Sequence, residues 1–328
     1  MSSLLKDKLE KTRNNRDLSI LDLLSIDDLS KNDISLILEL AEIFKQSKTE
    51  KTDILKSVTM INAFYEGSTR TRTSFEIAGK NLGSDVINVS GSASSIKKGE
   101  SYLDTTETLA AYHPKIIVIR SLESGLPNFL AKHVAPSIIN AGDGWHEHPT
   151  QALLDLMTML DYHKSLQGKI VTIVGDIFHS RVFGSLVRIL EKYDATIRVV
   201  SPETFIPQEI KQFNITLFTE IDKALADSDV IYALRVQEER GAKGYIPSLR
   251  EYSKTFGINP HRFALAKPDA ILMHPGPVIR DIDVHSNLVT HERSKILEQI
   301  ENGLAIRKAL IWLLGDRRDN KQKPYQLI

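Results

Sequence analysis

The chain of 328 residues contains no cysteine. This absence excludes disulfide bonds, thiolate nucleophiles and cysteine-ligated zinc or iron–sulfur sites. The chain also lacks a surplus of charge, because 42 Lys and Arg residues balance 42 Asp and Glu residues. Zero formal net charge argues against broad binding to a nucleic-acid backbone, although it allows a local basic pocket.

Long hydrophobic runs are also missing. No segment approaches the ~18 consecutive apolar residues of a membrane-spanning helix. Residues 1–17 are rich in charge and lack the apolar part of a signal peptide. We therefore predict a flexible extension over residues 1–17 and a cytoplasmic protein that binds no membrane. With 41% hydrophobic and 26% charged residues, the remainder has the composition of a globular protein of about two domains.

Short apolar runs alternate with helical periodicity along the rest of the chain. The first series predicts strands at 58–65, 86–89, 116–119 and 137–140, and helices at 30–43, 75–82 and 103–111. The second series predicts strands at 169–175, 196–200, 230–234 and 270–273, and helices at 152–160, 182–190, 221–226 and 296–314. This order predicts an α/β fold with two domains, each a mainly parallel sheet covered by helices on both faces. Ligands of such sheets bind beyond the carboxyl ends of the strands, so the loops that follow strands are the candidate sites.

The loop after the first predicted strand carries Ser68, Thr69, Arg70, Thr71 and Arg72 and opens a helix. The N–H groups at the start of a helix have no partner within the helix, and the helix dipole is positive there. Hydroxyls and guanidiniums at such a position predict an anion site that suits phosphate. A serine N-cap followed by solvated arginines is the structural alternative.

The segment from His146 to Gln151 also opens a helix. His148 and Gln151 are three residues apart and lie on one helical face, so both can donate to one carbonyl oxygen. An alternative makes His146 and His148 a metal pair, which is weaker because no matching carboxylate or histidine cluster accompanies them. A purely structural role is the alternative for His146.

Two loops of the second series carry arginine directly after a strand. The loop from Gly175 to Arg181 has one glycine where a dinucleotide site has G-x-G-x-x-G, which argues against a nicotinamide-dependent dehydrogenase. Arg181 in the first helical turn instead suits a carboxylate. A later strand is followed by Arg235 and Gln237, a second pair of this kind.

Two more loops are notable for their composition. His274-Pro-Gly-Pro277 is a rigid loop whose backbone carbonyls can face a ligand. Residues 92–100 combine small residues with Lys97 and Lys98, a composition more typical of a solvated turn than of a site.

Five of these motifs occur together in the order found in one enzyme family. The sequence closely resembles the aspartate/ornithine carbamoyltransferase family, and within it the aspartate-specific catalytic chains. The matching segments are 68–72, 97–100, 148–151, 235–237 and 274–277. The resemblance implies transfer of the carbamoyl group of carbamoyl phosphate to L-aspartate, giving N-carbamoyl-L-aspartate and phosphate, with no cofactor and no metal. It also implies a carbamoyl-phosphate-binding domain at 18–150, completed by a helix at about 292–328, and an aspartate-binding domain at 151–291.

The resemblance assigns roles to individual residues. Those expected to contact carbamoyl phosphate are Ser68, Thr69, Arg70, Thr71, Arg120, His148, Gln151, Gly276 and Pro277. Those expected to contact L-aspartate are Lys98, Arg181, Arg235 and Gln237. Those expected to act in catalysis are Arg70, Thr71, Arg120, His148 and Lys98. No protein base is required, because the departing phosphate can accept the proton of the amine.

The resemblance further implies a homotrimer with shared active sites, since the family inserts the lysine that matches Lys98 into the neighbouring subunit's site. The accompanying serine aligns with either Ser94 or Ser95. Some members of the family associate with a regulatory chain or a dihydroorotase, and nothing in the sequence selects among these assemblies. Trp145 and His146 stand where the family varies, so neither is assigned a role.

Two alternatives to this function stay open. Ornithine carbamoyltransferases share the phosphate motif, but an arginine-rich pocket would repel the ammonium group of ornithine. They also usually have His-Cys-Leu-Pro where this chain has His274-Pro-Gly-Pro277. A non-catalytic homologue that serves as a scaffold would be free to lose site residues, yet the phosphate motif, Lys98 and both acceptor arginines are present.

Overall fold

The computed structural model describes residues 2–14, 16–47, 51–91, 99–237 and 244–317. The chain divides into two compact units: unit 1 comprises Met1–Leu154 and Glu301–Ile328, and unit 2 comprises Asp155–Ile300. The chain passes from one unit to the other within helices α6 (Pro149–His163) and α12 (Ile296–Gly315). In the part of the chain that is described, no helix is long and apolar enough to cross a membrane.

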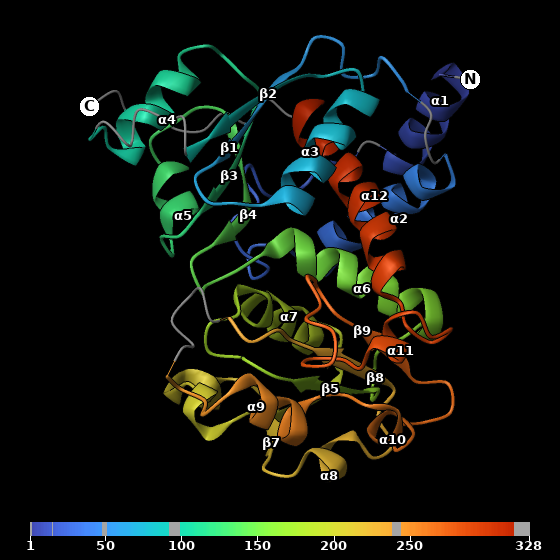
Figure 1. The fold of residues 1–328 in the computed structure, drawn as a ribbon. Coiled ribbons are helices and arrows are strands. Elements are labelled where there is room, and N and C mark those ends of the chain that lie inside the picture. Colours follow the sequence, from blue (N-terminus) through green and yellow to red (C-terminus); the bar gives the residue numbers. More distant parts are fainter. Residues whose placement is uncertain (1, 15, 48–50, 92–98, 238–243, 318–328) are drawn as a thin grey trace. The chain divides into compact units, whose positions relative to one another are not determined.

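Unit 1 is built on a parallel four-stranded sheet (Figure 1). Its strands follow the order β2 (Asp85–Ser90), β1 (Thr59–Phe64), β3 (Ile116–Ser121) and β4 (Ser137–Asp143). Ile61 and Ile117 lie on the face that packs against α4 (Tyr102–Ala110) and α5 (Leu126–Leu130). Met60 lies on the opposite face against α3 (Thr69–Asn81), where a Cβ on Gly79 would collide with the Met60 sulfur. Both faces of the inner strands are therefore covered, which explains why β1 and β3 read as continuous apolar runs.

Helix α2 (Lys31–Gln46) confirms the predicted N-cap at Ser30. The Ser30 hydroxyl accepts from the backbone N–H of Asp33, and the Asp33 carboxylate accepts from the backbone N–H of Ser30. Burial raises the pKa of Asp33, but hydrogen bonds from Ser19 and Ser30 outweigh this effect and lower it. This reciprocal pair satisfies two N–H groups at the helix start.

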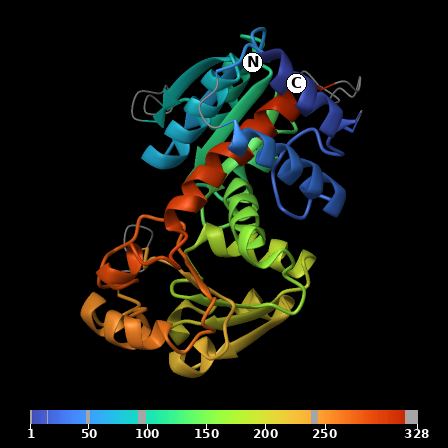
Figure 2. The same ribbon diagram turned by 90° about the vertical axis from the view of Figure 1, so that its right-hand side faces the viewer.

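The prediction of a flexible extension over residues 1–17 is wrong, because residues Ser2–Arg13 form helix α1. Leu5, Leu9 and Arg13 recur every fourth residue and are buried. The guanidinium of Arg13 lies 5.2 Å from the ring centre of Trp312 in α12 and pairs with Asp316 at 3.0 Å. Figure 2 shows the C-terminal part of α12 beside the N-terminal helices. The helix thus depends on partners about 300 residues away, which local periodicity does not reveal.

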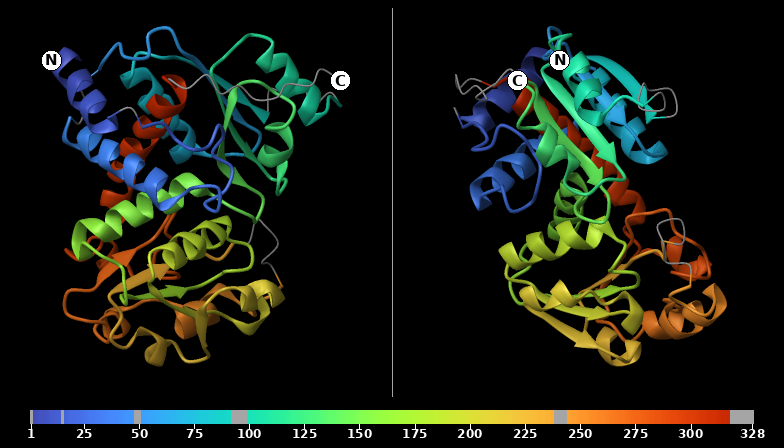
Figure 3. Two further views of the ribbon diagram at one scale, coloured as in Figure 1. Left: turned by 180° about the vertical axis from the view of Figure 1, so that it is seen from behind. Right: turned by 90° about the vertical axis from the view of Figure 1, so that its left-hand side faces the viewer.

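Unit 2 contains a parallel five-stranded sheet in the order β7 (Ile215–Phe218), β6 (Thr196–Val200), β5 (Ile170–Val174), β8 (Val230–Ala233) and β9 (Ile271–Met273). Val174, Ile231 and Leu272 pack on one face against the short helices α8 (Ile221–Leu225), α10 (Pro260–Phe263) and α11 (Ser286–Val289). Helix α7 (Arg181–Lys192) packs against β6 and lies on the opposite side from α8 and α10 (Figures 1 and 3). The predicted fold class is therefore confirmed for both units.

Several short elements were not predicted from the sequence. They are α5, β7, α9 (Leu249–Phe256), α10, α11 and the 3-10 turns at Glu203–Phe205 and Gln208–Gln212. Apart from α9, each has only three to five residues, which is too short for hydrophobic periodicity to identify.

Candidate active site

The strand order gives each unit one point where successive connections diverge to opposite sides of the sheet. In unit 1 this switch point lies between β1 and β3, and in unit 2 it lies between β5 and β8. Parallel sheets open a crevice for ligands at the carboxyl ends of the strands at such a point. The predicted site residues are therefore expected at these two places, one in each unit.

In unit 1, the predicted phosphate loop follows β1 and forms the first turn of α3. Ser68 is the N-cap residue, but its side chain makes no capping hydrogen bond to the first turn. Thr69 and Arg70 are exposed, whereas Thr71 is buried. A 13-residue helix begins here with hydroxyl and guanidinium groups at its positive end. This arrangement favours a bound anion.

Arg120 lies at the end of β3, directly across the switch point from this loop. Its Nε donates to the Glu66 carboxylate at 2.8 Å, and its Nη1 lies 3.4 Å from the Thr71 hydroxyl and 3.2 Å from the Ala141 carbonyl. Arg120 and Glu66 are both largely buried, with side chains 12% and 8% exposed. The structure thus brings Arg120 to the predicted phosphate loop and fixes its guanidinium through Glu66.

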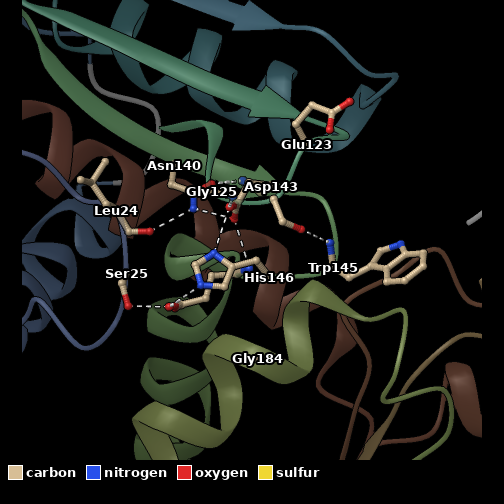
Figure 4. A network of polar contacts seen from close by, with 12 residues as sticks. Leu24, Ser25, Glu123, Gly125, Asn140, Asp143, Trp145, His146 and Gly184 are labelled. Atoms are coloured by element: carbon tan, nitrogen blue, oxygen red, sulfur yellow. Dashed lines mark hydrogen bonds and ion pairs between the residues drawn. The ribbon is translucent and has the colours of Figure 1, made fainter. Parts of the chain in front are cut away.

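A buried carboxylate, Asp143, organises the turn that leads into α6 (Figure 4). It accepts from the backbone N–H groups of Gly125 and Glu147 and from the Asn140 amide at distances of 2.6, 3.1 and 2.9 Å. The His146 ring lies 3.0 Å from it through Nδ1. These contacts give His146 a structural partner.

Glu147, the next residue, ties the same turn to the N-terminal segment of unit 1. Its carboxylate accepts from the Ser25 hydroxyl at 2.5 Å and from the backbone N–H of Ile26 at 3.0 Å. His148 and Gln151 follow at the start of α6 and are 4% and 8% exposed. The turn therefore holds both predicted carbonyl donors on a rigid helix start, after the strand next to β3. Trp145, in contrast, is 47% exposed.

The alternative of a metal pair at His146 and His148 receives no support from the geometry. Across the described ranges, no three His, Asp or Glu side chains form a group that could hold a metal ion. His146 instead points to Asp143, as Figure 4 shows.

In unit 2, Arg181 and the pair Arg235 and Gln237 follow the two strands that flank the switch point. Arg181 is the first residue of α7 and is 2% exposed. Arg235 is half-buried, and its Nη2 donates to the Gln237 side-chain oxygen at 3.1 Å. Gly175 allows the two loops to approach, since its φ is +127° and a Cβ there would collide with the Leu234 carbonyl.

Asp176 joins these two loops and was given no role from the sequence. Its buried carboxylate accepts from the backbone N–H of His179 and of Gln237, both at 3.1 Å, and contacts the His179 ring at 3.0 Å. Tyr252 packs beneath the same region, and burial, together with the negative charges of Asp283 and Asp176, raises its pKa well above the usual value. The carboxylate of Asp176 thus holds the two loops together, and Tyr252 is buried nearby.

The loop from His274 to Pro277 follows β9, the strand next to β8. The ring nitrogen Nδ1 of His274 accepts from the backbone N–H of Gly276 at 2.8 Å, and the Gly276–Pro277 peptide bond is cis. Pro277 is exposed. Lys98 and its neighbours Ser94 and Ser95 lie outside the described residues, so their predicted roles stay predictions.

Two family models match almost the whole chain. The carbamoyl-phosphate binding domain of aspartate/ornithine carbamoyltransferases matches residues 21–161, and the aspartate/ornithine binding domain matches residues 167–314. The chain belongs to the aspartate/ornithine carbamoyltransferase family. Helix α1 lies before the part that these models cover.

Curated relatives of this carbamoyltransferase family point to the aspartate branch. The catalytic subunit of aspartate carbamoyltransferase from Natranaerobius thermophilus is 49% identical over 91% of this chain and 96% of its own. The corresponding subunit from Syntrophotalea carbinolica is 48% identical over 89% and 95%.

Similar solved structures share the fold and include enzymes named for two different acceptors, aspartate and ornithine. Aspartate transcarbamoylase from Trypanosoma cruzi, in complex with carbamoyl aspartate and phosphate, has a TM-score of 0.79 at 29% identity and covers 89% of this chain and 94% of its own. Ornithine carbamoyltransferase from Pyrococcus furiosus has the same TM-score at 30% identity and covers 89% and 96%. The backbone therefore does not distinguish the two acceptors.

Three carboxylates beside the predicted site residues were missed from the sequence: Glu66, Asp143 and Asp176. Each lies at or just beyond the carboxyl end of a parallel strand, beside a predicted anion-binding loop. An acidic residue at that position is the signal that could have identified them, because it has to be neutralised by N–H donors or an arginine when it is buried.

Proposed function

We propose that this chain is an aspartate carbamoyltransferase. The observation that carries the proposal is the pair of loops at the switch point of unit 2, where Arg181 and Arg235 follow adjacent strands and Asp176 ties their backbones together. Two guanidiniums suit an acceptor with two carboxylates, as aspartate has, and disfavour one with a side-chain ammonium. The names of the curated relatives at 45–49% identity support the same acceptor.

We assign carbamoyl phosphate to unit 1. In this proposal the first turn of α3 binds the phosphate through Ser68, Thr69, Arg70 and Thr71, and Arg120 completes the site. The distance of 3.4 Å between Arg120 Nη1 and the Thr71 hydroxyl supports a shared anion at this place. His148 and Gln151 are assigned to the carbonyl oxygen, and the backbone of Gly276 and Pro277 to the carbamoyl group. L-aspartate is assigned to Arg181, Arg235 and Gln237, with Lys98.

The reaction needs hydrogen-bond donors that stabilise an oxyanion, and it needs no general base from the protein. The aspartate nitrogen attacks the carbamoyl carbon, a tetrahedral oxyanion forms, and the bond from carbon to the phosphate oxygen then breaks. The departing phosphate accepts the proton that the amine loses, so atoms and charges balance without a protein base. Arg70, Thr71, Arg120 and His148 are assigned to stabilise the oxyanion, an effect worth about 10²–10³ in turnover for one donor. Since two anions must react, holding them together supplies the other large part of the rate.

The proposal includes a cytoplasmic homotrimer with shared active sites, in which Lys98 serves the site of the adjacent subunit. A cyclic trimer closes head-to-tail contacts without leaving an unused face.

The acceptor is tested by measuring the ureido product colorimetrically with carbamoyl phosphate and either L-aspartate or L-ornithine. We expect product with aspartate and none above the blank with ornithine. Faster reaction with ornithine would assign the chain to the other branch of the family, and no product with either acceptor would favour a non-catalytic scaffold.

A further inference from the structure

A continuous set of buried hydrogen bonds in unit 2 leads to the loop that follows β9. Asp155 lies in α6, and one of its carboxylate oxygens accepts from the Gln299 amide at 2.7 Å. The other oxygen accepts from the Tyr232 hydroxyl at 2.6 Å. The Gln299 side-chain oxygen accepts from the backbone N–H of His274 at 3.0 Å. All four residues are at most 2% exposed.

The orientation of the Gln299 amide follows from its two partners. A carboxylate only accepts, and a backbone N–H only donates, so Gln299 has to direct its NH₂ group to Asp155 and its oxygen to His274. One orientation satisfies both partners, and the reversed one satisfies neither. Gln299 therefore bridges the Asp155 carboxylate and the backbone N–H of His274, so the position of Asp155 affects the position of the backbone at the start of the loop.

The loop is fixed further along by the His274 ring. Its Nδ1 accepts from the Gly276 N–H at 2.8 Å, and its Nε2 faces the Asp283 carboxylate at 3.4 Å. Asp283 in turn accepts from the backbone N–H of Ile279 at 2.8 Å, just beyond the loop. Gln299 and the His274 ring thus hold the loop, and Asp283 holds the segment just beyond it; all three side chains are buried.

Asp155 and Gln299 lie at the two ends of unit 2 in the sequence. Asp155 is the first residue of unit 2, and Gln299 is its last residue but one. The two helices that enter and leave the unit are therefore joined to each other, to β8 through Tyr232 and to the loop after β9.

We propose that Asp155 and Gln299 are positioning residues for carbamoyl transfer, which together with Tyr232 hold the His274–Pro277 backbone where it meets the carbamoyl group. This inference rests on the proposed function, in which Gly276 and Pro277 contact that group. A misplacement of about 1 Å at a reacting centre costs about 10²-fold in rate. Changes at Asp155 or Gln299 should therefore affect turnover and the binding of carbamoyl phosphate, and should leave the binding of aspartate unchanged.

The test is a reciprocal exchange. Gln299→Glu places a second carboxylate against Asp155 and removes the amide donor, so it should lower kcat about 10²-fold and raise the KM for carbamoyl phosphate. Adding Asp155→Asn restores the bond between positions 155 and 299 with its direction reversed, and the bonds from Tyr232 and from the His274 N–H keep their direction. The new amide at position 155 donates to the new carboxylate at position 299 and accepts from Tyr232 through its oxygen, while that carboxylate accepts from the His274 N–H. The double variant should be at least about tenfold more active than Gln299→Glu alone.

A matched control separates positioning from general stability. Asp229 is another fully buried carboxylate of unit 2, but it accepts from the backbone N–H of Ile170 at the opposite, amino-terminal end of the strands. Asp229→Asn should lower the unfolding temperature and leave kcat per folded molecule unchanged. Tyr232→Phe provides a milder second variant, which should give a smaller loss of kcat with the KM for aspartate unchanged.

The outcomes separate this inference from the function on which it rests. An active wild type, a selective loss in Gln299→Glu and recovery in the double variant support it. If the wild type is active but Gln299→Glu loses activity only in proportion to its folded fraction, as Asp229→Asn does, the positioning role is wrong and the proposed function stands. The same holds if the double variant does not recover activity. A wild type that forms no carbamoyl aspartate overturns the proposed function, and this inference with it.

Discussion

Arg235 is the residue whose replacement tests the choice of acceptor. In the structure its Nη2 donates to Gln237 at 3.1 Å and its Nη1 to the Val236 carbonyl at 3.3 Å, so the loop itself orients the guanidinium. A carboxylate pairs with such a group through two parallel hydrogen bonds. Lysine keeps the charge but supplies a single point contact in place of the planar fork.

The size of the effect follows from the lost bond. One hydrogen bond to a charged group is worth about 1.5–3 kcal/mol, which corresponds to about a 10- to 150-fold change in affinity. Arg235→Lys should therefore raise the KM for aspartate by about that factor. The KM for carbamoyl phosphate should change little, because the residues assigned to its phosphate lie in unit 1. Steady-state kinetics with each substrate varied in turn measures both values.

Arg198→Lys is the matched control in the same unit. Arg198 lies in β6 and donates to the carbonyls of Ala224 and Ala226 at 3.2 and 2.6 Å, so its replacement should affect stability and neither KM. If Arg235→Lys raises the KM values for both substrates equally, or leaves the KM for aspartate unchanged, the assignment of Arg235 to the acceptor is refuted.

Three further predictions concern substrate order, subunit sharing and acid stability. Calorimetry should show succinate, an inert analogue of aspartate, binding far more weakly without carbamoyl phosphate or phosphate, because the anion completes the acceptor pocket; equal affinity in both conditions contradicts this order. Lys98→Ala and His148→Ala chains, each inactive alone, should regain activity when mixed and reassembled, because a mixed trimer contains one native site; hybrid trimers that stay inactive would place Lys98 in its own chain's site. Burial raises the pKa of Asp229, but hydrogen bonds from Lys267, the Ile170 N–H and Lys169 outweigh this and lower it. Its contribution to folding is thus present at neutral pH and lost as pH falls below about 4, so denaturant unfolding should show a steeper acid loss for the wild type than for Asp229→Asn; parallel pH profiles would contradict it.

Much of the fold could be predicted because local signals and tertiary structure agree. Ser30 with Asp33 marks a helix start that the structure confirms, and the apolar run from Ile116 to Ile119 becomes a strand buried on both faces. The edge strand β7 could not be found in this way, since it has four residues and its central Thr216 and Leu217 are exposed. A short strand that is solvated on one edge has neither the length nor the pattern of a core strand.

The loops of the candidate site could be proposed from the sequence, but the buried side chains that hold these loops could not. The motif residues are consecutive, whereas Arg120 meets Glu66 across 54 positions, Gln237 meets Asp176 across 61 and Gln299 meets Asp155 across 144. The first two pairs form because parallel strands bring distant loops to one edge of a sheet. The third joins two helices, α6 and α12, that are far apart in the sequence. The prediction of a flexible extension over residues 1–17 failed because the partners of Arg13 are also distant in the sequence: Trp312 lies in α12 and Asp316 directly follows it.

The central claim is that the carbamoyl group passes from phosphate to aspartate on this chain. A mass balance tests it most directly: phosphate release and N-carbamoyl-L-aspartate are measured in one reaction, the first colorimetrically and the second by mass spectrometry. The account predicts one phosphate for each carbamoyl aspartate in the wild type, and loss of both together in His148→Ala. Phosphate release without carbamoyl aspartate, or transfer to ornithine in preference to aspartate, would contradict it.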